Sequence, residues 1–383
     1  MKKTLSRLLA AAMIGLFVLS PALAESRNAP LFYDQVAVLA YHHIDETAES
    51  GVTITPDLFR RQLEYLQDKD YHFITLEDFK GFLAGGPVPA NATLVTFDDG
   101  YQSFYTKAYP ILKELDIPAV NFVITGDLEH PLDTRIPSLS RDQIQEMTTS
   151  PLSVTAQCHT HRLHRKSQEG TPLLLKQKTD GRLETPEEYA SRIQNDTASC
   201  LRELDRIENR KHDSFAYPFG LFDKEAENNI QSAGIAFAFT TLNEMASRRC
   251  DPMQIPRINA GSPYMDPEKL HNQVLYRTSL EVPETKYVPL SRTLRQLGGF
   301  ATQTESGQLQ IQYKDQVYLV SPDTLTAKSG PSVIRLESPL QERNGKNYIL
   351  LKDLESILGE KIVFNPNRHV YQTRQAPTVK ASR

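Results

Sequence analysis

The sequence predicts an α/β protein built around a parallel β-sheet and followed by a smaller α+β domain. Short apolar segments that favour strands alternate with amphipathic helical segments from residue 36 to residue 276. About seven or eight such strand–helix units predict a distorted, closed or nearly closed (β/α) barrel. Beyond residue 283 the pattern changes to the alternating apolar residues of antiparallel strands. A length of 383 residues also favours two domains over one.

The composition is that of an ordinary soluble globular protein, with 39% hydrophobic and 23% charged residues. The net charge of -4 gives no indication of a nucleic-acid partner. Cys158, Cys200 and Cys250 are the cysteines of the chain. So few cysteines, in an odd number, argue against a disulfide framework, although one bridge remains open.

The N-terminus has the pattern of a secretory signal peptide over residues 1–24. Basic residues precede an apolar run over 8–19, and small residues stand at Ala22 and Ala24. We therefore expect cleavage after Ala24 and a secreted, periplasmic or cell-surface location. The apolar run is short for a membrane span, and an uncleaved anchor is the alternative.

The first domain is expected over residues 34–282. Its strands are short apolar runs at 36–41, 73–74, 94–97, 119–124, 152–156, 214–218, 235–239 and 254–258. Its helices begin at the caps Thr55, Thr75 and Ser140 or lie over 108–115, 186–209, 224–233 and 267–276. In such a fold the carboxyl ends of the strands form the active face.

Two adjacent carboxylates, Asp98 and Asp99, directly follow the apolar run Leu94–Phe97, and Gly100 then allows a sharp turn. Ligands and catalytic groups collect at this end of parallel strands. A solvated turn is the alternative interpretation, because Asp and Gly are common turn residues.

Three histidines follow the strand expected over 152–156, namely His159, His161 and His164. Together with one of the two aspartates, His159 and His164 would leave open positions on Zn²⁺, and Co²⁺ or Ni²⁺ would fit the same ligands. His161 is interpreted as a bystander or a supporting group. Exposed loop histidines without a metal are the alternative.

This set of side chains suits the hydrolysis of an amide or an ester. A divalent metal lowers the pKa of a water molecule and polarises a carbonyl oxygen. Adjacent aspartates point in different directions, so one can hold the metal while the other takes a proton from the water.

Three motifs, Thr96–Gly100, His159–His164 and Ala216–Gly220, resemble those of the polysaccharide deacetylase family, also called the NodB-homology or carbohydrate esterase 4 family. The resemblance covers roughly residues 34–280. The wide histidine spacing and the opening Tyr41–His42 are similar to the branch that acts on poly-β-1,6-N-acetylglucosamine. The resemblance implies a NodB-type barrel and metal-dependent removal of N-acetyl groups from a glycan.

The resemblance also implies roles for individual residues. Asp98 would be the catalytic base, and the backbone N–H of Phe219 would contribute to the oxyanion hole. The implied metal ligands are Asp99, His159 and His164. The residues expected to contact the sugar are His42, Tyr217, Pro218 and Phe219.

The sequence departs from the family pattern at several points. Many members have an arginine where Ala216 stands, and Arg257 is the candidate that would orient Asp98 instead. The chain has no Trp, so the usual late Asp–Trp pattern is incomplete, and a clear Leu-x-x-His motif for the general acid is missing. His271 is a candidate acid, but its helical setting favours a surface residue. The acid stays unassigned.

The second domain is expected over residues 283–373. It should contain a β-hairpin at Lys314–Asp315 and an internal repeat, because 289–298 and 350–359 both read as short helices ending at a glycine. It resembles copper amine oxidase N-terminal-like domains, which need not bind copper. We therefore expect this domain to associate with cell wall or glycan. The tail over 374–383 is expected to be disordered.

The function that these observations predict is that of an exported, metal-dependent polysaccharide N-deacetylase with an N-acetylated glycan as its partner. Peptidoglycan and chitin oligomers are alternative substrates. The missing acid motif favours a non-catalytic glycan-binding protein, whereas the intact Asp98, Asp99, His159 and His164 argue against it. An esterase that acts on O-acetylated glycans is a third alternative.

Overall fold

The computed structural model describes residues 30–374, apart from 48–49, 169, 180, 209, 305–307, 344 and 367. The predicted signal peptide lies outside the described residues, and so does the predicted tail except for Arg374. Across the part of the chain that is described, no helix is both long and apolar enough to cross a membrane.

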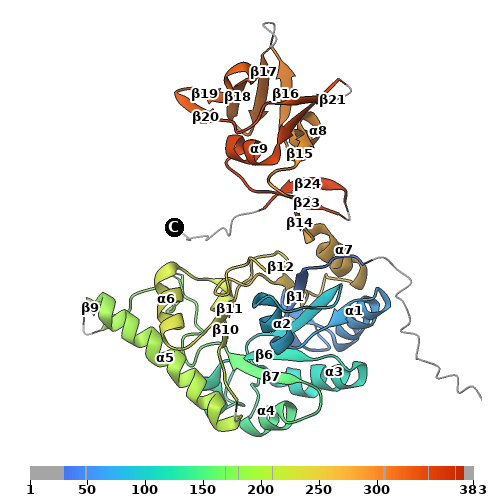
Figure 1. The fold of residues 1–383 in the computed structure, drawn as a ribbon. Helices are drawn as coiled ribbons and strands as arrows, with labels where there is room; N and C mark the ends of the chain where they lie inside the picture. The colour runs from blue at the N-terminus through green and yellow to red at the C-terminus, as the bar shows by residue number, and fades with distance from the viewer. Residues whose placement is uncertain are drawn as a thin grey trace, which may run out of the picture.

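A nine-stranded, mostly parallel sheet forms the centre of the larger lobe (Figure 1). Its main strand order is β11-β10-β7-β6-β5-β1-β12, with β4 beside β5 and β13 beside β1. The strands are β1 (Gln35–Tyr41), β4 (His72–Phe73), β5 (Ala92–Phe97), β6 (Ala119–Val123), β7 (Val154–Cys158), β10 (Ser214–Ala216), β11 (Phe237–Phe239), β12 (Ala246–Ser247) and β13 (Ile258–Asn259). All but β12 run parallel to their neighbours.

The sheet curls until one segment touches both of its edges. Ile255 forms a parallel bridge with Phe239 of β11, and Ile258 of β13 pairs with Leu39 of β1. Pro256 between them has no N–H to donate, which explains why the strand expected over 254–258 is split. The alternation of strands and helices therefore correctly predicts a distorted (β/α) barrel, although continuous strand pairing does not close it.

Helices cover the outside of the sheet and follow the strands in the order that the sequence predicts. They are α1 (Pro56–Asp68), α2 (Leu76–Leu83), α3 (Tyr109–Leu115), α4 (Arg141–Thr148), α5 (Pro186–Ile207), α6 (Lys224–Ser232) and α7 (Pro267–Arg277). One π-helical turn, η1 (Phe104–Ala108), precedes α3, and the 3₁₀ turns η2 (Thr125–Glu129) and η3 (Pro218–Gly220) follow β6 and β10. The caps Thr55, Thr75 and Ser140 accept hydrogen bonds from backbone N–H groups of the first turn, as predicted.

The strands of the barrel are apolar on both faces. Every residue of β1 and β5 is buried. Along β1, Val36 and Val38 belong to one apolar cluster, whereas Leu39 and Tyr41 belong to another. Burial on both faces is characteristic of parallel sheets covered by helices, and it holds the strand ends in fixed positions.

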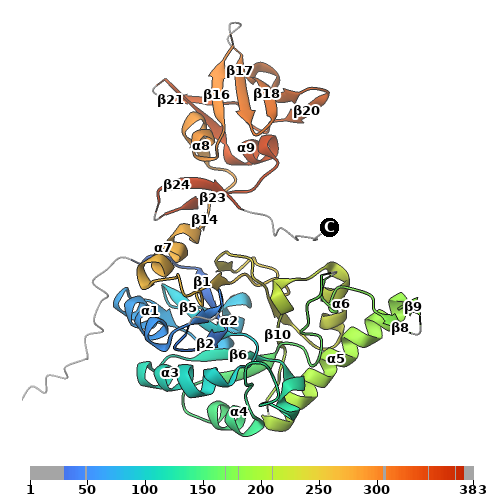
Figure 2. The ribbon, with the colours of Figure 1, turned by 180° about the vertical axis from the view of Figure 1, so that it is seen from behind.

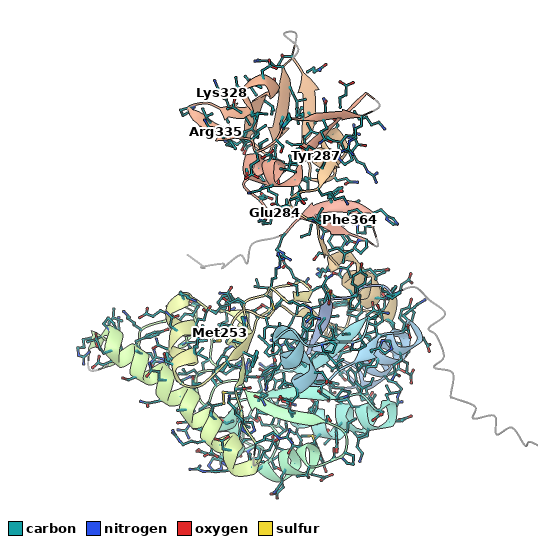
Figure 3. All side chains as sticks on the ribbon, in the orientation of Figure 1. Met253, Glu284, Tyr287, Lys328, Arg335 and Phe364 are labelled. Carbon is teal, nitrogen blue, oxygen red and sulfur yellow. A yellow bond between two sulfur atoms is a disulfide. The ribbon has the colours of Figure 1, made fainter. Side chains whose placement is uncertain are left out.

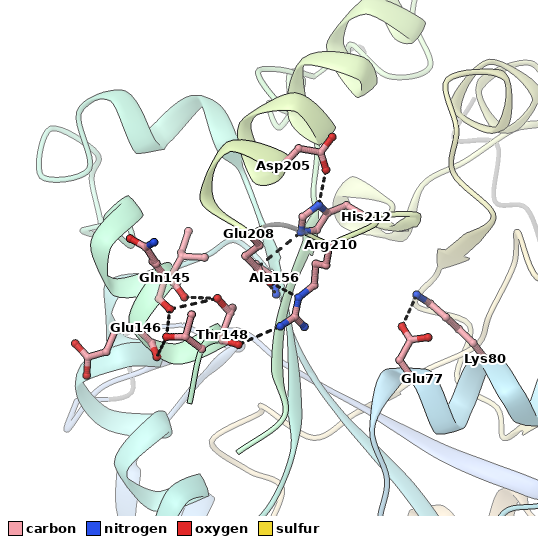
Figure 4. Close-up of polar contacts among 12 residues, drawn as sticks. Glu77, Lys80, Gln145, Glu146, Thr148, Ala156, Asp205, Glu208, Arg210 and His212 are labelled. Carbon is pink, nitrogen blue, oxygen red and sulfur yellow. Dashed lines mark hydrogen bonds and ion pairs between the residues drawn. The ribbon is translucent and has the colours of Figure 1, made fainter. Parts of the chain in front are cut away.

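The sheet opens between β7 and β10, which pair at a single position. Glu208 and Arg210 lie close to Ala156 of β7 (Figure 4). The Glu208 carboxylate accepts a hydrogen bond from the Ala156 N–H at 3.4 Å and pairs with Arg210 at 2.7 Å. His212 pairs with Asp205 at 2.7 Å. The Glu208 carboxylate thus gives the Ala156 N–H an acceptor that the strand ladder does not provide.

The smaller lobe has a separate apolar core and antiparallel strands (Figure 2). Its strands are β14 (Leu280–Glu281), β15 (Tyr287–Pro289), β16 (Phe300–Gln303), β17 (Leu309–Tyr313), β18 (Gln316–Ser321), β19 (Thr326–Ser329), β20 (Ser332–Arg335), β21 (Gln341–Arg343), β22 (Lys346–Leu350), β23 (Ile362–Asn365) and β24 (Val370–Thr373). Its helices are α8 (Leu290–Gln296), α9 (Leu351–Leu358) and the turn η4 (Pro322–Thr324). Two short ribbons, β2 (His43–Ile44) with β3 (Thr53–Ile54) and β8 (Lys178–Thr179) with β9 (Arg182–Leu183), belong to the larger lobe.

The internal repeat corresponds to two strand–helix units, β15–α8 and β22–α9. The strands β15 and β22 pair with each other in antiparallel fashion. Each helix is followed by a glycine with positive φ, Gly298 after α8 and Gly359 after α9. The hairpin predicted at Lys314–Asp315 joins β17 to β18, where Tyr313 pairs with Gln316.

The smaller lobe joins the barrel at the amino end of β1. The Gln35 side chain accepts a hydrogen bond from the Ser279 N–H at 2.8 Å, just before β14. Strand β14 then pairs with β23 of the smaller lobe. Glu284 and Phe364 lie at this junction in Figure 3. The smaller lobe is therefore attached at the end of the barrel opposite to the carboxyl ends of the strands.

Candidate metal centre

Three neighbouring parts of the barrel turn sharply directly after a strand. Asp99 follows β5 with a φ of 73°, Thr160 follows β7 with a φ of 73°, and Phe219 follows β10 with a φ of 59°. Non-glycine residues rarely adopt this left-handed conformation, which costs on the order of 1–3 kcal/mol per residue. Such strain concentrates at functional sites, because the surrounding structure must enforce it.

The turns bring the three predicted metal ligands together. The Oδ1 atom of Asp99 lies 3.3 Å from Nε2 of His159 and 3.2 Å from Nε2 of His164. One ligand atom from each residue lies within 4.8 Å of the others. Asp99 and His159 are buried, and the side chain of His164 is 16% exposed. The group therefore faces solvent on the side of His164.

The hydrogen bonds of His159 show that the group fits a cation. The Nδ1 atom lies 2.7 Å from the carbonyl oxygen of Ala216, so Nδ1 carries the proton that it donates. In the neutral ring, Nε2 then presents a lone pair to a carboxylate oxygen of Asp99. The lone pairs of His159 Nε2 and Asp99 Oδ1 repel each other at this distance, so a proton or a metal ion between them is needed to stabilise the arrangement. Two imidazole nitrogens and one carboxylate form a typical ligand set for a divalent metal, with the second nitrogen of His159 held by a carbonyl.

The charges around the group also favour a cation. Burial by itself would raise the pKa of Asp99, but the neighbouring histidines hold that pKa well below its usual range. Burial lowers the pKa of His164 to about 4, so its imidazole is neutral at physiological pH. Burial opposes the charged form of His159 as well, but Asp99 and Asp98 raise its pKa. A proton and a metal ion therefore compete for the same position.

Asp98 lies beside the ligand group and pairs with Arg257. Its two carboxylate oxygens accept hydrogen bonds from the two terminal guanidinium nitrogens, each at 2.7 Å. Both side chains are buried, and Nε of Arg257 donates to the carbonyl oxygen of Thr240 at 2.8 Å. Burial alone would raise the pKa of Asp98, yet the Arg257 guanidinium holds it below its usual value. Asp98 is thus an ionised carboxylate that is not needed as a ligand.

His42 directly follows β1 and also faces this carboxylate. Its Nε2 lies 3.8 Å from Oδ2 of Asp98, and its side chain is 21% exposed. Its Nδ1 is buried with no hydrogen-bond partner in the described part of the chain. From the sequence, His42 is expected only to contact sugar, and the proton donor is unassigned. His42 directly follows a buried strand, and this position was the signal that could have placed it at the same edge as Asp98.

The motif after β10 is only partly exposed. Tyr217 is fully buried, and its hydroxyl donates to the carbonyl oxygen of Met253 at 3.1 Å. Pro218 is buried too. The side chain of Tyr217 is part of the barrel core, and Pro218 has little exposed surface. Their predicted contact with sugar stays a prediction. Phe219 is 39% exposed, and its ring centroid lies 4.6 Å from that of His164. Of this motif, Phe219 alone presents its side chain at the metal group.

The other candidate histidines lie outside the ligand group. Nδ1 of His161 lies 3.0 Å from the hydroxyl oxygen of Thr125. His271 is part of α7, and its Nδ1 lies 2.9 Å from the hydroxyl oxygen of Tyr71. Neither contact involves the ligand residues, so the structure offers His271 no position for proton transfer.

One disulfide joins Cys158 to Cys200, and Cys250 is a free thiol. The possibility of a single bridge, left open by the sequence, is therefore realised. Cys158 is the last residue of β7 and directly precedes His159.

A cavity of about 420 Å³ lies at the junction of the two lobes, and its lining includes none of the metal-ligand candidates.

Comparisons with known proteins identify relatives of the barrel. A family model described as polysaccharide deacetylase matches residues 85–238. The poly-β-1,6-N-acetyl-D-glucosamine N-deacetylase of Staphylococcus aureus strain MSSA476 is 27% identical over 206 residues, which are 54% of this chain and 67% of that protein. The enzyme of the same name from Staphylococcus epidermidis is 27% identical over 253 residues, covering 62% and 83%.

Solved structures give the same result. The structure of IcaB from Ammonifex degensii is 30% identical and has a TM-score of 0.50, with 59% of this chain and 91% of that chain covered. The chain therefore belongs to the polysaccharide deacetylase family and has its NodB-type fold. It is a carbohydrate deacetylase, a hydrolase that acts on an N-acetylated polysaccharide, as the sequence predicted.

Proposed function

We propose that the protein is a metal-dependent N-deacetylase of poly-β-1,6-N-acetylglucosamine. The observation that carries the proposal is the ionised Asp98, paired with Arg257, beside the converging Asp99, His159 and His164. Relatives that bear the name of this activity support the choice of substrate. The products would be acetate and a glycan with free amines.

Asp99, His159 and His164 are the residues that would hold the metal. Zn²⁺ suits one carboxylate and two imidazoles, and Co²⁺ or Ni²⁺ would fit the same donors. A divalent metal at this position would polarise the acetyl carbonyl and lower the pKa of the attacking water. The partly exposed His164 leaves one side of the group open to substrate.

The side chains around the ligand group would then move the protons. Asp98 would accept a proton from water as its oxygen attacks the acetyl carbon. Arg257 would hold Asp98 ionised and in a fixed orientation, since it binds both carboxylate oxygens. His42 would donate a proton to the amine nitrogen as the carbon–nitrogen bond breaks. This order balances one proton taken from water against one given to the leaving amine.

The carbonyl oxygen gains negative charge during the attack. We assign its stabilisation partly to the backbone N–H of Phe219, in the turn after β10. The left-handed φ of Phe219 and of Gly220 shapes this turn. A Cβ on Gly220 would lie 1.9 Å from the Thr241 hydroxyl oxygen, so only glycine fits. The exposed Phe219 ring would support a sugar ring at the entrance of the site.

The proposal also includes export of the protein and a role for the smaller lobe. Disulfides such as Cys158–Cys200 persist in oxidising compartments, which favours export. The smaller lobe is attached away from the metal group, so we assign it a role in association with cell wall or glycan rather than in the reaction. Loss of the contact between the smaller lobe and glycan would then change where the protein is located but not the reaction that the barrel catalyses.

The test is acetate release from β-1,6-linked N-acetylglucosamine oligomers with added Zn²⁺, Co²⁺ or Ni²⁺. Asp98→Asn should lower the rate by about 10²–10⁴-fold, the usual contribution of a general base, while metal binding is retained. Asp353→Asn makes the same chemical change at a buried carboxylate of the smaller lobe and should leave the rate unchanged.

Other outcomes would revise the proposal in defined ways. Release from chitin or peptidoglycan fragments alone would keep the chemistry and change the substrate. Release from small acetyl esters alone would indicate an O-acetyl esterase. Metal binding without acetate release from any of these compounds would contradict a catalytic role and indicate a glycan-binding protein.

A further inference from the structure

The six residues that carry both histidine ligands form a loop against helix α5. Two successive backbone N–H groups of this loop, those of His161 and Arg162, donate to the side chain of Asp196 on α5. The distances are 2.9 Å to Oδ1 and 2.7 Å to Oδ2. One carboxylate therefore binds the middle of the loop with both of its oxygens.

The opposite side of the loop is bound to the turn after β6. The Thr125 N–H donates to the carbonyl oxygen of Thr160 at 3.1 Å, and the Gly126 N–H donates to that of His161 at 2.8 Å. A Cβ on Gly126 would lie 2.2 Å from the His161 oxygen, so the close approach requires glycine. The loop is thus held between η2 and α5, and Asp196 supplies the contact from the α5 side.

A second link from α5 lies one helical turn further along. Cys200 stands four residues after Asp196, so both face the same side of the helix. Its disulfide with Cys158 fixes the residue directly before His159. Helix α5 therefore holds the start of the loop through the disulfide and the middle of the loop through Asp196. Of these two links, the one through Asp196 is the nearer to His164 along the chain.

A carboxylate suits this task better than other side chains. It has two acceptor oxygens in one plane, which match two successive N–H groups, and hydrogen bonds to an ionised acceptor are stronger than neutral ones. Asp196 is only partly exposed, and burial raises its pKa while the two N–H groups oppose this. Without Asp196, two backbone donors beside the metal group would lose their partner, and the loop would shift toward another acceptor.

We propose that Asp196 is a positioning residue that sets the metal affinity by fixing the loop between His159 and His164. The inference rests on the proposed function of Asp99, His159 and His164 as a metal site. In the described part of the chain, the side chain of Asp196 is hydrogen-bonded to the backbone of His161 and Arg162 and not to the side chains of Asp99, His159 or His164. It acts through the backbone, as the supporting contacts of metal ligands generally do.

Metal affinity separates this role from a general contribution to stability. Asp223→Ala is the matched control, because Asp223 accepts a backbone N–H bond from Ala226 at 2.8 Å as the cap of α6 and not from the histidine loop. Both Asp196→Ala and Asp223→Ala remove a carboxylate acceptor of backbone N–H groups and should lower the melting temperature of the metal-free protein. Only Asp196→Ala should weaken the binding of metal.

The experiment is a titration of the metal-free full-length protein with Zn²⁺ and with Co²⁺, with the Co²⁺ absorption spectrum as a second readout. Asp196→Ala should raise the dissociation constant about 10–100-fold, the usual effect of losing a supporting contact, and should change the Co²⁺ spectrum. Asp196→Asn keeps one acceptor oxygen and should show a smaller increase. If Asp196→Ala does not fold, the metal affinity of Asp196→Asn alone tests the proposed role of Asp196.

Three results would overturn the inference, and they differ from one another. Unchanged metal affinity in Asp196→Asn and Asp196→Ala would show that Asp196 only stabilises the fold. An equal loss of affinity in Asp223→Ala would show that any loss of stability has this effect. A wild-type protein that binds neither metal would contradict the metal site itself, and with it the proposed function.

Discussion

The two lobes differ in how their strands run, and this difference determines where chemistry can occur. In the barrel, the parallel strands β1, β5, β7 and β10 all end at the same edge. Residues that follow them, such as His42, Asp98, His159 and Phe219, therefore meet. In the smaller lobe the strands are antiparallel, so their carboxyl ends alternate between opposite edges. Parallel topology is thus what gathers the functional residues.

Buried carboxylates show the same contrast at the level of single residues. In the smaller lobe, Asp353 accepts the backbone N–H groups of Glu337 and Ser338 at 2.8 Å and 3.2 Å, and so connects two segments. In the barrel, Asp98 binds the charged side chain of Arg257 at the edge of the ligand group. The first carboxylate serves folding, whereas the second keeps its charge available for proton transfer.

The largest effect is expected at a residue of the barrel edge. His42→Gln should lower the rate of acetate release by about 10²–10⁴-fold, because the leaving amine would lose its proton donor. Metal affinity should stay the same. The measurement is single-turnover acetate release. His271→Gln, a histidine of α7 outside the site, is the control and should keep full activity. A rate in His42→Gln near that of the control would show that another group supplies the proton.

Removing one partner of the ion pair beside the ligand group should strongly destabilise the barrel. Arg257→Met should cost about 3–5 kcal/mol of unfolding free energy, because it leaves the buried Asp98 without a partner. Denaturant unfolding would measure this loss. Asp98→Leu combined with Arg257→Met removes both charges and should be more stable than Arg257→Met alone. If the double variant were the less stable one, the buried pair would not be the cause.

A core substitution in the smaller lobe tests the independence of the two regions. Leu354 of α9 is fully buried in the core of that lobe. Leu354→Ala should cost about 2–5 kcal/mol in the stability of this lobe through the cavity it creates. Acetate release from short oligomers and metal affinity should remain unchanged, since the lobe is attached away from the site. A fall in either quantity would reveal a coupling between the lobes.

The smallest effect is expected at a buried hydroxyl of the smaller lobe. Thr293 of α8 is fully buried, and its hydroxyl has no hydrogen-bond partner among the residues that the structure describes. Thr293→Val keeps the shape and removes an unsatisfied polar group, so it should raise the unfolding free energy by up to about 1 kcal/mol. Thermal unfolding would detect the change. A clear destabilisation would mean that the hydroxyl has a partner in solution.

The sequence alone was sufficient for features that depend on local patterns. Apolar runs indicate buried strands, and capping residues such as Thr55 indicate the starts of helices. The order of the barrel elements was therefore predictable. Asp99, His159 and His164 were predictable as a group, because parallel strands place the residues after them at one edge. The change to antiparallel strands beyond residue 283 was equally visible in the alternation of apolar residues.

Only the tertiary structure decided the contacts between distant segments. Arg257 and Asp98 are 159 positions apart. Only the family resemblance suggested Arg257 as a partner of Asp98, and the fold alone brings the two side chains into contact. The burial of Tyr217 and the place of His42 beside Asp98 likewise depend on how the sheet curls. The same holds for Asp196, whose carboxylate meets the histidine loop only after α5 packs on the barrel. Local sequence determines which elements form, but distances between side chains depend on packing across the whole fold, which no short stretch of sequence contains.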